Sequence, residues 1–334
     1  MSMGCSCFTW ESEDGKLHFQ GRTYDTVPQP DMALVFCPRN MEFHLLADPA
    51  SPSVKLPYAM MGMGMGPGML SQPLLFDGVN EYGLMGANLL YPGFATYTPM
   101  EKAGPKAVYP GFYVAYILGQ CRDLDELIAL AKESQLVDEV IQGRHATCHY
   151  IFSDKTGRSV VLEPDPEGLT IYDHAHGVLT NSPSYSWHLT NLRNYLVQTR
   201  TNPEPKTLDG EVLKKFGSGG GTWGVPGDFS PPSRFVRLSF AREYLVKGKD
   251  ELTSVMAMMN GFSVVNVPEG MVEEAPGWYD ISLYTSVFCA ESLTYYYKTY
   301  KTQRVNALKM APLLDTSEIK VYPIIHTPSV NYLD

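Results

Sequence analysis

Two cysteines near the start of the chain are candidate nucleophiles. Cys5 follows Met1-Ser-Met-Gly4, and Cys7 stands two residues later. A thiolate is a strong nucleophile. If Met1–Gly4 were removed, Cys5 would also carry a free α-amine, which holds its proton more weakly than lysine does and could act as a base near neutral pH. The alternative interpretation is an ordinary cysteine in a strand.

The segment Gly21-Arg-Thr-Tyr-Asp25 holds two charges that could activate such a cysteine. In a strand, Arg22 and Tyr24 point to one face, and Thr23 and Asp25 to the other. If the strand breaks after Tyr24, both charges can approach Cys5. Arg22 would then favour the thiolate, and Asp25 would hold the α-ammonium. A salt bridge at the strand end is the competing interpretation.

Two further polar residues are candidates for a catalytic site. In Leu179-Thr-Asn-Ser-Pro183, the Asn181 side chain could donate to an oxyanion, or it could form an Asx-turn. Arg234 is expected in the first turn of a helix capped by Ser233 and running to about residue 246. A cation is slightly unfavourable there, which suggests an anionic partner.

Hydrophobic periodicity predicts the elements that must position these residues. Strands are expected at 17–24, 32–36, 147–152, 159–163, 169–173, 281–288 and 293–300. Helices are expected at 112–135, broken near Cys121 with Asp123 or Asp125 as a cap, and at 185–197. The Gly- and Met-rich residues 59–70 are interpreted as a flexible apolar loop. Strands at both ends with helices between them indicate a layered α+β fold.

Composition excludes several classes of protein. Apolar residues make up 44% and charged residues 19%, as in ordinary globular proteins, and the net charge is −10 without a basic cluster. Binding to nucleic acid or to an anionic membrane surface is therefore not expected. No apolar run reaches the length of a membrane span, and the first residues do not form a secretory signal. Six scattered cysteines suggest a reducing cytoplasm.

Five segments together resemble the choloylglycine hydrolase family, which includes conjugated bile acid hydrolases and penicillin V acylases. The matching segments are Cys5-Ser-Cys-Phe-Thr, Gly21-Arg-Thr-Tyr-Asp25, Asp77-Gly-Val-Asn-Glu-Tyr-Gly-Leu84, Leu179-Thr-Asn-Ser-Pro183 and Gly227-Asp-Phe-Ser-Pro-Pro-Ser-Arg-Phe235. They span nearly the whole chain, and the Asn181-to-Arg234 spacing is similar to that of the family.

The resemblance implies a fold and a set of roles. The fold would be a four-layer αββα Ntn-hydrolase sandwich, with two antiparallel sheets flanked by helices. Residues 5–334 would form one domain after loss of the leader 1–4. The implied site comprises Cys5 as nucleophile, Arg22 beside the thiol, Asp25 against the α-amine, the Asn181 side chain and the Leu90 backbone N–H as oxyanion donors, and Arg234. No metal or organic cofactor is implied.

Several features depart from the family pattern. Bile acid hydrolases tend to have Asn, and penicillin V acylases Tyr, where this chain has Leu90, so this marker does not identify the substrate. The interval from Cys5 to Arg22 is one residue longer than usual, which keeps Cys7 as a minor alternative nucleophile. The Met-rich segment falls where the family places a loop over the acyl pocket. We therefore predict substrate contacts from Met60, Met61, Met63, Met65 and Tyr24.

The predicted activity is hydrolysis of a linear, non-peptide amide with an apolar acyl group, of the penicillin V acylase or bile salt hydrolase type. N-acyl homoserine lactones or N-acyl amino acids are alternative substrates, and an amine could intercept the thioester in an acyl transfer. A third hypothesis is an unprocessed, non-catalytic binding protein on the same scaffold. The resemblance also suggests a homotetramer, with residues 191–215 as an assembly arm.

Overall fold

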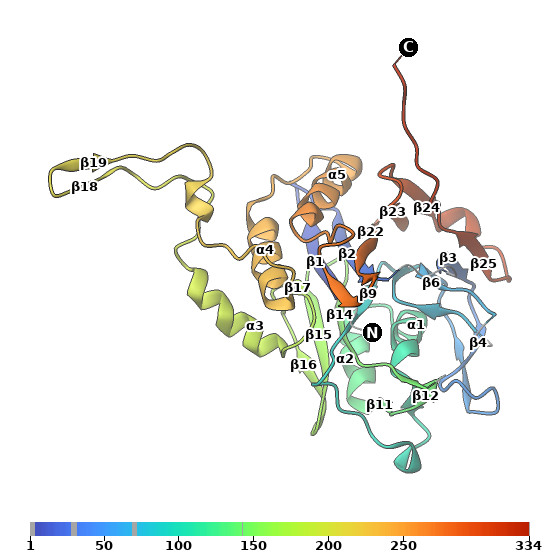
Figure 1. Cartoon of the computed structure of the whole chain (residues 1–334). Helices are drawn as coiled ribbons and strands as arrows, with labels where there is room; N and C mark the ends of the chain where they lie inside the picture. Colours follow the sequence, from blue (N-terminus) through green and yellow to red (C-terminus); the bar gives the residue numbers. More distant parts are fainter. Residues whose placement is uncertain (1–3, 28–31, 69–71, 142, 334) are drawn as a thin grey trace.

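Two antiparallel sheets face each other at the centre of the molecule (Figure 1). The computed structural model describes residues 4–27, 32–68, 72–141 and 143–333. The six-stranded sheet has the order β17 (Val178–Leu179), β1 (Gly4–Glu11), β2 (His18–Thr26), β22 (Ile281–Cys289), β23 (Thr294–Thr299) and β24 (Asn306–Lys309). The strands β1, β2 and β22 are buried almost throughout, because they are covered on both faces.

The second sheet contains nine strands. Its order is β16 (Gly168–Tyr172), β15 (Ser159–Asp165), β14 (Cys148–Ser153), β9 (Met85–Leu90), β8 (Asp77–Asn80), β6 (Met60–Met65), β3 (Met32–Cys37) and β25 (Lys320–Pro323), with β7 (Leu74–Leu75) paired to β6. Five two-stranded ribbons lie outside the sheets: β4 (Met41–His44) with β5 (Ser53–Leu56), β10 (Ala107–Val108) with β11 (Gln135–Leu136), β12 (Val140–Ile141) with β13 (Arg144–His145), β18 (Lys206–Leu208) with β19 (Glu211–Leu213), and β20 (Glu273–Ala275) with β21 (Trp278–Tyr279).

Helices cover the outer faces of both sheets. Helices α4 (Pro231–Tyr244) and α5 (Glu251–Gly261) pack on the six-stranded sheet, α1 (Tyr113–Gln120) and α2 (Leu124–Glu133) pack on the nine-stranded sheet, and α3 (Tyr185–Leu192) packs against α4. One apolar cluster joins the two sheets with α4 and α5, and a second lies between the nine-stranded sheet and the helices α1 and α2. This arrangement confirms the predicted αββα sandwich. Of the helices in the described part of the chain, none is long and apolar enough to cross a membrane.

Most predicted elements are present within a few residues of their expected bounds. The helical region is broken after Gln120, and Asp123 caps α2 by accepting hydrogen bonds from the backbone N–H groups of Asp125 and Glu126. The predicted helix at 185–197 is shorter, because α3 ends at Leu192 and a 3-10 turn follows.

The prediction of a flexible loop at residues 59–70 is wrong for Met60–Met65. Met60–Met65 form β6, a strand in the interior of the nine-stranded sheet, while residues 69–70 lie outside the described residues. The glycines are needed for this packing. A Cβ on Gly62 would lie 1.8 Å from the carbonyl oxygen of Asp77, and a Cβ on Gly64 would lie 1.9 Å from that of Leu74. Alternating glycines therefore permit close approach of neighbouring strands.

The predicted start of the helix at Ser233 is also wrong. Helix α4 begins at Pro231, with Ser230 at the N-cap. Proline is favoured in the first helical turn because its missing N–H would have no intrahelical partner there. Ser233 instead lies inside the helix, where its hydroxyl donates a hydrogen bond of 2.6 Å to Asp228 Oδ2.

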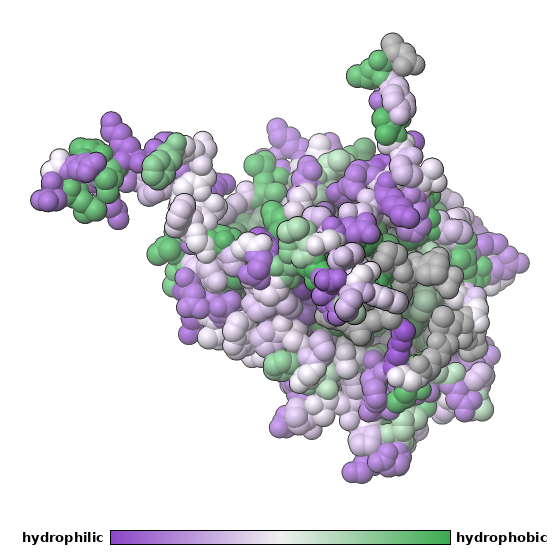
Figure 2. Space-filling model, viewed as in Figure 1, coloured by the Kyte–Doolittle hydropathy of each residue, from purple (hydrophilic) through white to green (hydrophobic). Residues whose placement is uncertain are grey.

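An arm formed by residues 193–224 projects from the body of the molecule and carries the ribbon β18–β19 (Figure 1). It includes most of the segment predicted to act in assembly. Figure 2 shows apolar side chains along this arm. Phe216 is fully exposed and Trp223 is 85% exposed.

Candidate active site

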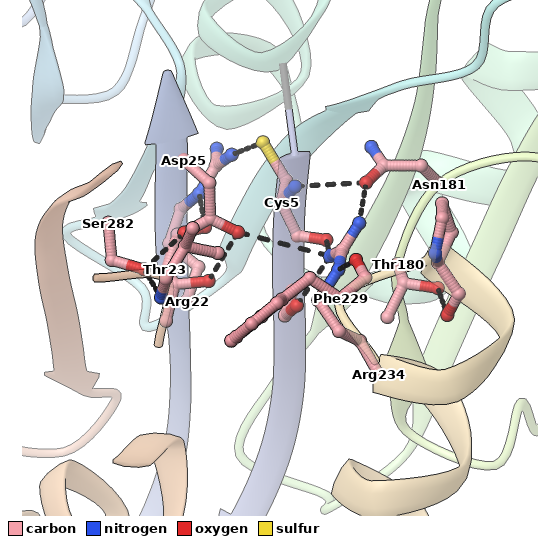
Figure 3. Close-up of polar contacts among 12 residues, drawn as sticks. Cys5, Arg22, Thr23, Asp25, Thr180, Asn181, Phe229, Arg234 and Ser282 are labelled. Atoms are coloured by element: carbon pink, nitrogen blue, oxygen red, sulfur yellow. Dashed lines mark hydrogen bonds and ion pairs between the residues drawn. The ribbon is translucent and has the colours of Figure 1, made fainter. Parts of the chain in front are cut away.

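Strand β2, the end of β17 and helix α4 bring Arg22, Asp25, Asn181 and Arg234 around Cys5 of β1 (Figure 3). In their register, Cys5 lies opposite Tyr24, and Gly4 lies opposite Asp25. The strand β2 does not end after Tyr24 but continues to Thr26, and a register shift between Tyr24 and Asp25 changes its pairing with β22 at this position. Consequently Arg22 reaches Cys5 on the face toward the second sheet, and Asp25 lies on the face toward α4.

Arg22 is completely buried, and its guanidinium is held by several partners. Nη1 donates to the carbonyl oxygens of Phe76 at 2.9 Å and Asn88 at 2.8 Å, both from the facing sheet. Nη2 is 2.6 Å from Cys5 Sγ. Because two carbonyls anchor Nη1, Nη2 is directed at the thiol.

Asp77 is the buried anion beside this arginine. Its Oδ2 lies 3.8 Å from Arg22 Nε and accepts a hydrogen bond of 2.7 Å from the Tyr284 hydroxyl. Its Oδ1 accepts from the Tyr295 hydroxyl and from Met63 N–H. The sequence reasoning assigned no role to this residue, although it begins one of the matching segments. The sequence signal available for it was an acidic residue directly after the apolar residues Leu74-Leu-Phe76.

Arg234 organises the opposite side of β1. Nη1 donates to the Cys5 carbonyl and to Ser6 Oγ, Nη2 donates to Asn181 Oδ1 at 2.7 Å, and Nε donates to the Phe229 carbonyl at 2.9 Å. The anion suggested by its helical position is Asp25, whose Oδ2 lies 3.9 Å away without a hydrogen bond.

Asp25 has its own partners at the start of β22. Its Oδ1 accepts a hydrogen bond of 2.6 Å from Ser282 Oγ, and Thr23 Oγ1 lies 3.4 Å from its Oδ2. Burial raises the pKa of Asp25, and Arg234 opposes the increase. Gly4 fits tightly here, because a Cβ at this position would lie 3.1 Å from Asp25 Oδ2.

The Asn181 amide links Cys5 to the second sheet. Its Oδ1 accepts a hydrogen bond of 2.9 Å from Cys5 N–H, and its Nδ2 donates one of 2.8 Å to the Leu90 carbonyl. The second N–H of Nδ2 is not engaged by any described residue. Tyr91 N–H bonds to the Thr147 carbonyl, so strand alternation turns the Leu90 N–H away from β14.

A second polar network holds the backbone around Asn181. His188 Nε2 lies 2.8 Å from the Asn181 carbonyl, and His149 Nε2 lies 3.0 Å from the Thr180 carbonyl. The other nitrogen of His149 lies 3.1 Å from Glu163, which is fully buried. Sequence reasoning missed this network, because its members come from β14, β15 and α3.

Electrostatics at the sulfur depends on opposing effects. Burial raises the pKa of the Cys5 thiol, and the nearby Arg22 guanidinium opposes the increase. Cys7 is fully buried, and burial raises its pKa far above the usual range of thiols. Cys7 also lies inside β1, paired with β2 on one side and β17 on the other. This position favours Cys5 over Cys7 as the reactive thiol.

A pocket of about 580 Å³ opens beside Cys5 on the side of its backbone nitrogen. It is lined by Gly4, Asp25, Asn181 and Arg234, together with residues of the segment 267–280.

None of the predicted pocket methionines lines this space. Met60, Met61 and Met63 are fully buried, and Met65 is partly buried. Tyr24 is also buried, between Phe76 and Tyr284. Contact of these residues with substrate therefore remains a prediction.

Comparison with known proteins gives a consistent result. The family model described as linear amide C–N hydrolases, choloylglycine hydrolase family, matches residues 5–322. The chain is 34% identical to a bile salt hydrolase/transferase of Clostridium perfringens, covering 99% of this chain and 100% of the relative. It is 29% identical to a bile salt hydrolase/transferase of Lactiplantibacillus plantarum, covering 96% and 97% of the two chains.

Solved structures show the same fold. A mutant of conjugated bile acid hydrolase from Clostridium perfringens superposes with a TM-score of 0.90 at 30% identity, covering 99% of this chain and 100% of the other. Penicillin V acylase from Agrobacterium tumefaciens gives a TM-score of 0.74 at 20% identity, covering 97% and 94%. The latter likeness concerns the fold alone.

Proposed function

Because this chain belongs to the choloylglycine hydrolase family of linear amide C–N hydrolases, we propose that it hydrolyses conjugated bile salts through Cys5. One observation carries the role of this residue: its Sγ lies 2.6 Å from Arg22 Nη2, and its backbone nitrogen lies 2.9 Å from Asn181 Oδ1. Nucleophile and α-amine would thus both be positioned on one residue. The names of the relatives support bile salts as the substrate.

Activation requires removal of the leader, residues 1–4. While Gly4 is attached, the Cys5 nitrogen is an amide and cannot act as a base. Removal creates an α-ammonium next to the thiol and admits water, and both changes favour the thiolate. Asp25 and Asn181 Oδ1 then hold the ammonium, and Arg22 stabilises the thiolate.

Acylation follows from this geometry. The Cys5 thiolate attacks the amide carbonyl carbon and forms a C–S bond. The second N–H of Asn181 Nδ2 and the Leu90 N–H stabilise the oxyanion. The C–N bond breaks as the α-ammonium of Cys5 passes a proton to the leaving nitrogen.

Deacylation reverses the roles. The neutral α-amine of Cys5 takes a proton from water, which attacks the thioester carbonyl, and the C–S bond breaks. The products are the free acid and the restored thiol. Arg234 acts by fixing the Cys5 carbonyl, Ser6 and Asn181, and therefore positions the nucleophile.

The test is amine release from a substrate panel by protein whose loss of residues 1–4 is verified by intact mass. The panel holds glycine- and taurine-conjugated cholate, penicillin V, an N-acyl homoserine lactone and an N-acyl amino acid. Cleavage of a cholate conjugate supports the proposal. Exclusive cleavage of another member reassigns the substrate. Retention of the leader without turnover supports the alternative of a binding protein.

We also propose that the chain forms a homotetramer in the cytoplasm. The exposed apolar side chains of the arm, including Leu208, Val212 and Phe216, support assembly. All six cysteines are free and buried, which fits a reducing compartment. Light scattering of the purified protein tests the assembly, and fractionation of the source cells tests the compartment.

A further inference from the structure

Two buried histidines hold the backbone that carries the Asn181 side chain. His149 Nε2 lies 3.0 Å from the Thr180 carbonyl oxygen, and His188 Nε2 lies 2.8 Å from the Asn181 carbonyl oxygen. Both rings are fully buried, one on β14 and the other on α3. Two consecutive carbonyl groups are therefore fixed by two different elements of the fold.

The partners of the rings determine which nitrogens carry protons. A backbone carbonyl only accepts hydrogen bonds, so Nε2 of each ring must carry a proton. In His188, Nδ1 has no hydrogen-bond partner among the described residues, and burial lowers the pKa of this histidine to about 4. Its ring stacks on Phe235 with the centroids 4.6 Å apart. At neutral pH, His188 is thus an uncharged ring that donates from Nε2.

His149 is oriented through its other nitrogen. Nδ1 lies 3.1 Å from Glu163 Oε1, and the Tyr185 N–H donates to the same oxygen at 2.9 Å and to Oε2 at 3.1 Å. The Tyr91 ring stacks on His149 with the centroids 4.5 Å apart. Because the ring is held at one nitrogen and on one face, its Nε2 is directed at the Thr180 carbonyl.

The bonds of the Asn181 side chain show why its backbone must be fixed. Oδ1 accepts from the Cys5 N–H and from Arg234 Nη2, and Nδ2 donates one N–H to the Leu90 carbonyl (Figure 3). The other N–H of Nδ2 is the proposed oxyanion donor. Such a donor is effective only at about 3 Å from the position of the developing charge. A rotation of the peptide groups at 180–181 would move this N–H out of that range.

We propose that His149 and His188 are positioning residues of the oxyanion site, which set the direction of the free Nδ2 N–H of Asn181. This inference rests on the proposed role of Cys5. Strand β14, which carries His149, also pairs with β9 and places Cys148 opposite Leu90. The same strand therefore locates both proposed oxyanion donors, the Asn181 amide and the Leu90 N–H. The two histidines act through this backbone and not on the reacting atoms.

Paired amide substitutions separate the hydrogen bond from the rest of the side chain. The amide nitrogen of glutamine reaches about as far as histidine Nε2, whereas that of asparagine reaches only about as far as Nδ1. His188→Gln should therefore retain the bond to the Asn181 carbonyl, and His188→Asn should lose it. In the same way, His149→Gln should retain the bond to the Thr180 carbonyl, and His149→Asn should lose it.

Two reactions of the Cys5 thiol distinguish positioning from a general effect on the nucleophile. Acylation by p-nitrophenyl acetate forms a C–S bond through a tetrahedral oxyanion and releases p-nitrophenolate. Alkylation by iodoacetamide forms a C–S bond, displaces iodide and forms no oxyanion. Both are measured on processed protein, and peptide mass identifies the labelled cysteine. The ratio of the two rates therefore reports on the oxyanion site.

We expect His188→Asn and His149→Asn to slow acylation about 10- to 100-fold, which is less than the roughly 100- to 1000-fold cost of removing an oxyanion donor itself. Alkylation should stay near the wild-type rate, and the two glutamine variants should recover most of the acylation. With a conjugate that is cleaved, kcat should fall while KM changes little, because the oxyanion forms only on the way to the transition state.

His18→Asn is the matched control. His18 is also a buried histidine on a strand, and it lies opposite Glu11, about 20 Å along β1 from Cys5. Both reactions should proceed in this variant as in the wild type. Where an asparagine variant lacks the wild-type circular dichroism spectrum, the corresponding methionine variant, which fills the space without a donor, takes its place.

Equal acylation rates in the wild type and in the asparagine variants would overturn the inference, and so would an equal loss of acylation and alkylation. If no conjugate of the panel is cleaved, the proposed substrate fails, and the ratio of acylation to alkylation still decides the positioning role. Absence of Cys5 acylation in the wild type would refute the role of Cys5 and the inference with it.

Discussion

The side chains around Cys5 are buried and hydrogen-bonded, whereas the apolar side chains of the projecting arm are exposed. Arg22 is fully buried, and its guanidinium donates to three backbone carbonyls and lies against the Cys5 sulfur. In the arm, β18 and β19 pair with each other and with no other described strand, and Trp223 is 85% exposed. The site is thus organised by the fold of one chain. The ribbon of the arm is exposed throughout, and such exposed apolar side chains are what the proposed assembly would cover.

Replacing the nucleophile should have the largest effect. Cys5→Ala removes the thiol and should lower kcat/KM by at least about a thousandfold, because no thioester can form. Amine release from a cleaved substrate measures the loss. Circular dichroism should show an intact fold, since a small side chain is replaced by a smaller one. Turnover near the wild-type level would contradict the assignment of Cys5.

Gly4→Val should impair maturation. Its Cβ would lie 3.1 Å from Asp25 Oδ2 and 3.2 Å from Asp25 Cβ, and the added methyl groups increase the clash. Intact mass over time should show residues 1–4 retained in most molecules, with turnover reduced in proportion. Ser2→Ala, within the same leader, is the control and should mature normally. Normal processing of Gly4→Val would show that this fit is not required.

Asp77→Asn should disturb the site without touching the sulfur. Asp77 orients Arg22 through its charge and accepts hydrogen bonds from Tyr284 and Tyr295. We expect kcat/KM to fall about 10- to 100-fold, as for residues that orient catalytic groups. The alkylation rate of Cys5 by iodoacetamide should change as well. Tyr284→Phe removes one hydrogen bond and should have a smaller effect; equal activity of all three proteins would exclude this positioning role.

The double variant Phe216→Ser and Trp223→Ser should affect assembly more than chemistry. Both side chains are exposed in the arm and lie outside the network around Cys5. Light scattering should show a smaller particle mass, while kcat/KM per chain should change less than about threefold. An unchanged mass would show that these two residues do not form the interface.

Residue types and local spacing named the candidate site residues, and the resemblance of five segments to one family implied their roles. Cys5, Arg22, Asp25, Asn181 and Arg234 lie in short segments whose order along the chain carries the signal. Seven of the strands in the described residues were also predicted, because apolar, aromatic and β-branched residues are concentrated in segments such as β3, β14 and β22. These features depend on neighbours within a few residues, which a single sequence displays.

The tertiary structure alone decided the features that depend on distant segments. Met60–Met65 has the composition of a loop, yet it forms a central strand because Gly62 and Gly64 admit carbonyls of Asp77 and Leu74. Asp77 meets Tyr284 and Tyr295 only when the two sheets stack. Asp25 likewise accepts a hydrogen bond from Ser282 only after β22 pairs with β2. Sequence determined which groups exist, and packing determined which of them share a buried environment, because burial and close approach are properties of contacts between remote parts of the chain.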